Sequence, residues 1–237
     1  METEPERKIE NLFVFGFVFE LCLVPVAAIL GYWLTGNAFP FRLELLNLVW
    51  VRDGILWGVA ATVPIGLLPL LATSPIGRRI TPLRVIYERV KAKLGDALLR
   101  LSTGEVILLA ASAGIGEEVL FRGVLHNSIG IVWTSILFGL LHALTFTYFI
   151  LAALISFYFG WLYDITNFEG VPGGGHLLVP IIVHWLYDVL ALVFFRRRLR
   201  EDLAENAADN EADESKLSST LKPTQSERNN DDFSEDH

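Results

Sequence analysis

The sequence predicts an all-α polytopic membrane protein: a bundle of about six transmembrane helices, a surface amphipathic helix and a disordered acidic C-terminal tail. Of its 237 residues, 52% are hydrophobic and 19% are charged, whereas a soluble domain carries about 25% charged residues. Residues 201–237 hold 12 acidic and 3 basic side chains, and the rest of the chain is nearly balanced. The acidic charge therefore belongs to the tail. We expect membrane lipid around the body of the protein and no nucleic-acid partner.

Six segments are long and apolar enough to cross the hydrocarbon core, which takes about 20 helical residues. They are residues 11–34, 54–73, 104–126, 129–146, 147–165 and 177–195. We expect the first to be a permanent span, because the polar METEPERKIE before it lacks the basic start of a signal peptide. The fourth and fifth segments are almost continuous, and the sequence leaves the boundary between them open.

The segments between the spans predict the orientation. Residues 81–100 are amphipathic with Arg and Lys on the polar side, which predicts a helix at the membrane surface. Three glycines at 173–175 predict a loop before the last span. Four spans separate the basic flanks at 78–93 and 196–200, so the positive-inside rule predicts that both flanks and both termini are cytoplasmic. We expect the protein to lie in the plasma membrane.

This organisation divides the chain into three parts. Residues 1–103 hold two spans and the basic amphipathic segment, residues 104–195 form a four-helix core, and residues 196–237 contain the basic flank and the acidic tail. The tail has too few apolar side chains to offset chain entropy, so it is predicted to be disordered. The single cysteine, Cys22, allows neither a disulfide within one chain nor a cysteine metal cluster.

Ionisable side chains inside the predicted spans are the candidates for chemistry, because each costs about 2.5–3.5 kcal/mol on insertion scales and usually faces the protein interior. They are Glu20, Glu117, Glu118, Arg122, His142, His184 and Asp188. Glu118 and Arg122 are four residues apart and share a helix face, so we expect an ion pair. Glu117 points about 100° away from Glu118. Without a partner on its own helix, it suits a general base or a metal ligand.

Helix geometry predicts that four of these side chains meet. A turn near residues 128–130 would fold the third and fourth spans into a hairpin. Glu117 and His142 would then lie about 18–20 Å from that turn. In the last span, His184 lies about 12 Å and Asp188 about 18 Å from the same side. All four can therefore reach one depth.

Each candidate also has a structural explanation. A lone histidine in a span more often bonds another helix than acts in catalysis. A structural role is also favoured for the Glu118–Arg122 pair, and a place at a helix interface for Glu20. His126 and His176 lie at predicted turns, where we expect them to be solvated. Convergence of two histidines and a carboxylate at one depth nevertheless favours a chemical function.

Three short segments carry a resemblance to a known family: EEVLFR at 117–122, FGLLH at 138–142 and HWLYD at 184–188. They resemble the E-E-x-x-x-R, F-x-x-x-H and H-x-x-x-N/D motifs of the CPBP/Abi intramembrane proteases. That family includes the type II CAAX prenyl endopeptidases and the bacteriocin-processing and immunity proteins. The match covers about residues 104–195. Asp188 stands where the prenyl proteases often have Asn, which disfavours a strictly prenylated substrate.

The resemblance implies hydrolysis of a peptide bond in a membrane-associated protein or peptide, lipidated or not. The catalytic positions that it implies are Glu117, Glu118, Arg122, His142, His184 and Asp188. Glu117 and His142 would activate water, and His184 with Asp188 would stabilise the oxyanion. Two versions stay open. Zinc could be bound by Glu117, His142 and His184, a common hydrolase ligand set, or Glu117 could be a general base without metal.

Two other classes of function also stay open. A proton-coupled transporter would likewise place Glu, His and Asp inside the membrane, but the sequence lacks the matching halves that such carriers have. A non-proteolytic membrane scaffold or immunity factor could keep the motifs without the activity, because fold does not determine function.

Overall fold

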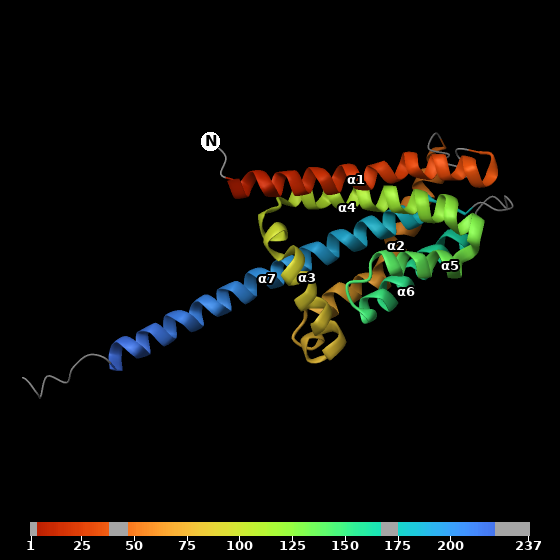
Figure 1. The fold of residues 1–237 in the computed structure, drawn as a ribbon. Helices are drawn as coiled ribbons and strands as arrows, with labels where there is room; N and C mark the ends of the chain where they lie inside the picture. The colour runs from red at the N-terminus through yellow and green to blue at the C-terminus, as the bar shows by residue number, and fades with distance from the viewer. Residues whose placement is uncertain (1–3, 38–46, 167–174, 221–237) are drawn as a thin grey trace, which may run out of the picture. The chain divides into compact units, whose positions relative to one another are not determined.

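The chain folds into helices in the computed structural model, which describes residues 4–37, 47–166 and 175–220 (Figure 1). In chain order these are α1 (Glu4–Thr35), α2 (Leu48–Thr73), α3 (Thr81–Arg100), α4 (Thr103–Leu120), α5 (His126–Leu141), α6 (Phe146–Ile165) and α7 (Leu178–Thr220). A 3-10 turn, η1 (Gly77–Arg79), precedes α3, and a π-helical turn, η2 (Phe121–Leu125), joins α4 to α5. The described residues contain no strand, and the predicted all-α membrane fold is confirmed.

Five helical stretches of the described chain are long and apolar enough to cross a membrane. They are Phe13–Thr35, Leu48–Thr73, Thr103–Leu141, Phe146–Ile165 and Leu178–Leu217. The third combines the third and fourth predicted spans, but it is not a straight rod. Gly130 has φ 79° and ψ 165° within it, a backbone conformation open essentially to glycine alone. The chain turns back there (Figure 1), so the hairpin expected near residues 128–130 is present.

The returning arm of α5 is short. From residue 131 to 141 it covers roughly 16 Å at 1.5 Å per residue, about half of the 30 Å hydrocarbon thickness. α6 begins at Phe146, so the boundary that the sequence left open falls at residues 142–145. His142 therefore follows a half-length helix, which allows its side chain to lie within the bundle.

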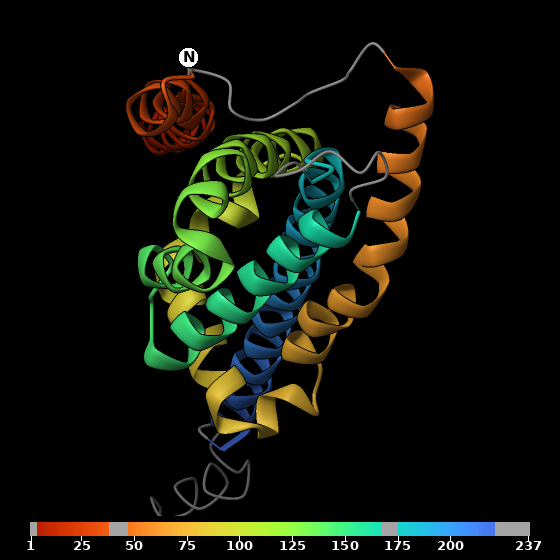
Figure 2. The same ribbon diagram turned by 90° about the vertical axis from the view of Figure 1, so that its right-hand side faces the viewer.

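Close helix packing holds α4 between α1 and α7. A β-carbon at Gly114 would lie 3.1 Å from the backbone nitrogen of Trp185 in α7, and one at Gly116 would overlap the backbone carbonyl of Glu20 in α1. Gly58 brings α2 equally close to α7. Small residues have this role in membrane helices because packing, rather than escape from water, drives their association. Figure 2 shows the first part of α7 between α2 and α4.

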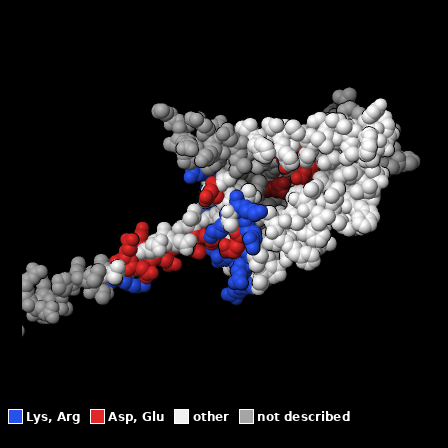
Figure 3. Space-filling model, viewed as in Figure 1, with Lys and Arg blue, Asp and Glu red and all other residues white. Residues whose placement is uncertain are grey.

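The basic segment at 78–93 and Arg196, the first residue of the second basic flank, lie at the same end of the bundle, where Figure 3 shows a band of Lys and Arg. Arg196 of α7 donates to the carbonyl oxygen of Leu101 at 2.9 Å, and the ring of Tyr87 in α3 lies 4.8 Å from that of Phe195. Elsewhere large apolar side chains face outward, as expected for contact with lipid. Examples with 63–82% exposure are Phe15, Trp33, Val63, Trp133 and Leu154.

Residues 198–237 form a second compact unit, and its described part is helical to Thr220. The prediction of disorder from residue 201 onward is therefore wrong as far as residue 220. Arg198 pairs with Asp202 at 2.6 Å and with Glu201 at 3.0 Å, and the segment is rich in Ala and Glu, which favour helix without needing burial. Residues 221–237, and 173–174 of the predicted glycine loop, lie outside the described residues.

Candidate active site

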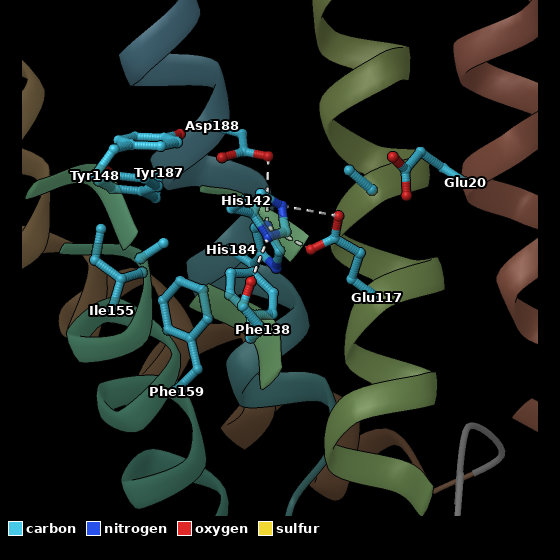
Figure 4. A pocket seen from close by; sticks show the side chains of 12 residues that line it. Glu20, Glu117, Phe138, His142, Tyr148, Ile155, Phe159, His184, Tyr187 and Asp188 are labelled. Atoms are coloured by element: carbon cyan, nitrogen blue, oxygen red, sulfur yellow. Dashed lines mark hydrogen bonds and ion pairs between the residues drawn. The ribbon is translucent and has the colours of Figure 1, made fainter. Parts of the chain in front are cut away.

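A cavity of about 230 Å³ lies among α1, α4, α5, α6 and α7 (Figure 4). Liquid water takes up about 30 Å³ per molecule, so the cavity has room for several water molecules or for part of a substrate. Figure 3 shows a hollow that contains acidic atoms, beside the band of Lys and Arg. A polar hollow in an apolar bundle is the expected setting for hydrolysis within a membrane protein.

Glu117 of α4 faces two imidazoles across this cavity (Figure 4). Its Oε1 lies 3.5 Å from Nε2 of His142, and its Oε2 lies 3.9 Å from Nε2 of His184. Asp188, one turn beyond His184 on α7, places Oδ2 3.5 Å from that same Nε2. The structure thus brings together the four side chains that were predicted to lie at a common depth in the membrane.

The other ring nitrogen of each histidine is held by an acceptor. Nδ1 of His142 lies 2.9 Å from the carbonyl oxygen of Phe138, and the two rings stack at 4.2 Å. Nδ1 of His184 lies 2.7 Å from Oε1 of Glu118. Because a carbonyl or carboxylate oxygen can only accept, both Nδ1 atoms carry the hydrogen. The Nε2 atoms are therefore the ones presented to Glu117.

Glu118 and Arg122 form the predicted ion pair, with Nη1 of Arg122 2.9 Å from Oε1 of Glu118 and both side chains at most 1% exposed. Nη2 of Arg122 also donates to the carbonyl oxygen and hydroxyl of Ser156 in α6, at 2.5 and 2.8 Å. The same Oε1 of Glu118 accepts from Arg122 and from His184. The pair therefore positions His184 from behind rather than facing the cavity.

Two carboxylates contact His184 from opposite sides of its ring. Nδ1 of His184 donates the short hydrogen bond to Glu118, and Asp188 lies on the Nε2 side. Helical periodicity could place Asp188 on the face of His184 because both belong to one helix. No spacing in the sequence relates Glu118 of α4 to a ring on α7.

The helix widens directly after the first motif. The π-helical turn η2 includes Arg122, and the side-chain amide of Asn127 donates to the carbonyl oxygens of Arg122 and Gly123 at 3.0 and 3.2 Å. Such turns often occur at functional sites because they change the direction of side chains along a helix. No signal in the sequence indicated this one.

Two histidines outside the motifs are buried, so the expectation that they are solvated is wrong. His126 is 8% exposed and its Nε2 lies 3.1 Å from Asp164 of α6. His176 is 2% exposed, stacks on Trp50 at 3.7 Å and has Nε2 2.9 Å from the Trp50 carbonyl oxygen. Both lie near helix ends, but neighbouring helices cover those ends.

Glu20 also belongs to the cavity lining. It lies where α1 approaches Gly116 of α4, which agrees with the interface expected for it. The sequence did not associate it with the motif residues, because no spacing relates the first span to the other three.

The chemistry of the donors fits zinc. Glu117, His142 and His184 are ligand types of catalytic zinc sites, and a hydrogen-bonded Nδ1 is typical of metal-binding histidines. The 3.5 and 3.9 Å separations are close to the roughly 3.4 Å between ligands of a tetrahedral zinc ion. Among the residues that the structure describes, however, no three His, Cys, Asp or Glu side chains are grouped so that they could hold a metal ion as they stand.

Comparison with known proteins covers the part of the chain that holds the motifs. Residues 100–190 match the family model of the type II CAAX prenyl endopeptidase Rce1-like proteins. "Uncharacterized protein YpbD" of Bacillus subtilis (strain 168) is 35% identical over 95 residues, which are 38% of this chain and 44% of that protein. The chain thus spans less than half the length of this relative, and no solved structure matches it. The resemblance to the CPBP/Abi proteases is confirmed: the segment with all three motifs is similar to the type II CAAX prenyl endopeptidases.

Proposed function

We propose that the protein is an intramembrane endopeptidase that hydrolyses a peptide bond of a membrane-associated protein or peptide. The observation that carries the proposal is the placement of Glu117 against the Nε2 atoms of His142 and His184, from three separate helices, at one cavity. The similarity of residues 100–190 to a protease family supports the same reaction.

In the proposed reaction Glu117 is the general base. It accepts a proton from a water molecule held beside it and His142, while the water oxygen attacks the carbonyl carbon of the substrate. His184 in its doubly protonated form, whose Nδ1 donates to Glu118, is placed to donate the hydrogen on Nε2 to the oxyanion that forms. Glu117 then returns the proton to the leaving nitrogen as the C–N bond breaks. Glu118 and Arg122 act as positioning residues, since Glu118 contacts His184, Arg122 contacts Glu118, and neither contacts the reacting atoms.

A zinc-dependent version of this proposal uses the same side chains. Glu117, His142 and His184 would hold the ion, and zinc supplies Lewis-acid activation of water when it is bound. Glu118 would keep its role in either version, because its hydrogen bond to Nδ1 of His184 leaves Nε2 available.

We also propose that the basic end of the bundle faces the cytoplasm, in the plasma membrane. Short basic flanks stay on the cytoplasmic side, and both flanks share one end. The hollow beside that end (Figure 3) would then receive substrates from the cytoplasmic side.

Glu117→Gln tests the activity because it keeps the size of the side chain and removes the base. Proteomes of cells that express wild type or this variant identify candidate substrates, and the purified proteins are then compared on peptides from them. We expect cleavage to fall by about 100- to 10,000-fold, the usual contribution of a general base. Glu88→Gln, an exposed carboxylate on α3, is the matched control and should cleave normally. Wild-type cleavage by Glu117→Gln would refute the proposal.

A further inference from the structure

Glu20 is a cavity residue from outside the segment that matches the protease family. It belongs to α1, whereas the match covers residues 100–190. In Figure 4 its carboxylate points from α1 toward the side of the cavity that Glu117 occupies. Its Oε2 is shielded from solvent and has no hydrogen-bond partner among the described residues. Since an ionisable group in a membrane span is costly, its place at a cavity needs a functional explanation.

The other acids of the cavity lie within ion-pair distance of a histidine nitrogen, whereas no such pair is found for Glu20 among the described residues. Glu117 lies within 3.9 Å of two imidazoles, and Asp188 lies 3.5 Å from one. Among the residues that the structure describes, the cavity lining contains no Lys or Arg, and the nearby Arg122 is engaged by Glu118 and Ser156. One carboxylate of the lining therefore lacks a counter-charge within the described protein.

Packing keeps Glu20 at this place. The backbone of Glu20 lies so close to α4 that even a β-carbon at Gly116 would overlap its carbonyl oxygen. α1 thus cannot approach α4 more closely at this level. The Glu20 side chain lines the same cavity as Glu117, the residue that follows Gly116.

The two sides of the cavity differ in character. Figure 4 shows Tyr148, Ile155, Phe159 and Tyr187 on the side opposite Glu20 and Glu117, with the histidines between them. A peptide whose scissile bond lies at the histidines would place one neighbouring side chain against the aromatic side. The neighbour on the other side of the bond would then lie beside Glu20.

We infer that Glu20 is a specificity residue that binds a positively charged side chain, Lys or Arg, next to the cleaved bond, while an apolar residue occupies the aromatic side. The inference rests on the proposed peptidase function and names its substrate class. It concerns recognition only, because Glu20 does not contact the atoms proposed to react. The substrate cation would be the counter-charge that this carboxylate lacks.

The test uses the full-length protein in detergent micelles and three synthetic peptides, identical except for Lys, norleucine or Glu at the position beside the cleaved bond. Binding and cleavage are measured for each. We expect the wild type to prefer Lys over norleucine by about tenfold or more, the usual effect of a hydrogen bond to a charged group. Glu20→Gln should bring that ratio close to one, and Glu20→Lys should favour the Glu peptide. Glu88→Gln should keep the wild-type ratio.

The outcomes separate this inference from the proposed function. If Glu117→Gln abolishes cleavage but Glu20→Gln leaves the Lys-to-norleucine ratio unchanged, the inference is wrong and the peptidase proposal stands. If Glu20 only holds α1 against α4, Glu20→Gln should lower the thermal unfolding midpoint and leave the Lys-to-norleucine ratio unchanged. This result would also refute the inference. If the wild type cleaves no peptide, the binding ratio alone decides: a Lys preference that Glu20→Gln removes supports recognition, and its absence refutes it.

Discussion

Replacing Arg122 with methionine removes a guanidinium that is 1% exposed and leaves the fully buried Glu118 without its cation. Three hydrogen bonds are lost, one to Glu118 and two to Ser156. Breaking a buried pair from one side costs about 3–5 kcal/mol, because the remaining charge stays buried. We therefore expect Arg122→Met to lower the free energy of unfolding by about that amount.

The double variant Glu118→Gln/Arg122→Met tests the physical reason. It removes both charges, and the amide oxygen introduced at position 118 can still accept from Nδ1 of His184. The loss that remains comes from the two hydrogen bonds to Ser156, about 1–3 kcal/mol. The double variant should therefore be more stable than Arg122→Met by about 2 kcal/mol.

Denaturant unfolding in mixed micelles, followed by tryptophan fluorescence, measures these differences. The exposed pair of Arg52 and Asp53, at 2.7 Å, offers a control, because Arg52→Met should cost about 1 kcal/mol or less. Equal destabilisation of the Arg122→Met single variant and the double variant would refute the reasoning. It would mean that the unpaired charge of Glu118 costs no stability when Arg122 is absent.

Three further predictions follow from the site and the turn. His142→Gln should lower cleavage at least about 100-fold with unchanged circular dichroism, and an active variant would remove this histidine from the mechanism. Gly130→Ala should lower the free energy of unfolding by about 1–3 kcal/mol, because φ is 79° there. Its control is Gly104→Ala, where a β-carbon meets only the Ser102 hydroxyl at 3.9 Å, and equal unfolding midpoints would contradict the prediction. Dialysis against a chelator should leave cleavage unchanged if Glu117 acts without metal, whereas loss that zinc restores would establish the zinc-dependent version.

Apolar segment lengths and residue spacing were enough to predict the fold class and the common depth of the site residues. A membrane requires backbone groups to be paired within each segment, so long apolar stretches must be helices. The Glu118–Arg122 pair followed from a spacing of four residues. The common level of Glu117 and His142 followed from the fixed rise per residue on either side of the turn at Gly130.

The rotation of the helices toward one another could not be predicted from residue spacing and is seen in the folded protein. Periodicity places a side chain at a depth and on a face of its own helix, but it does not say which neighbour that face meets. Close contacts at Gly114 and Gly116 set the rotation of α4 against α7 and α1. That rotation brings Glu118 to Nδ1 of His184 and brings Glu20 and Glu117 to one cavity, and neither arrangement has a signature in the spacing of residues.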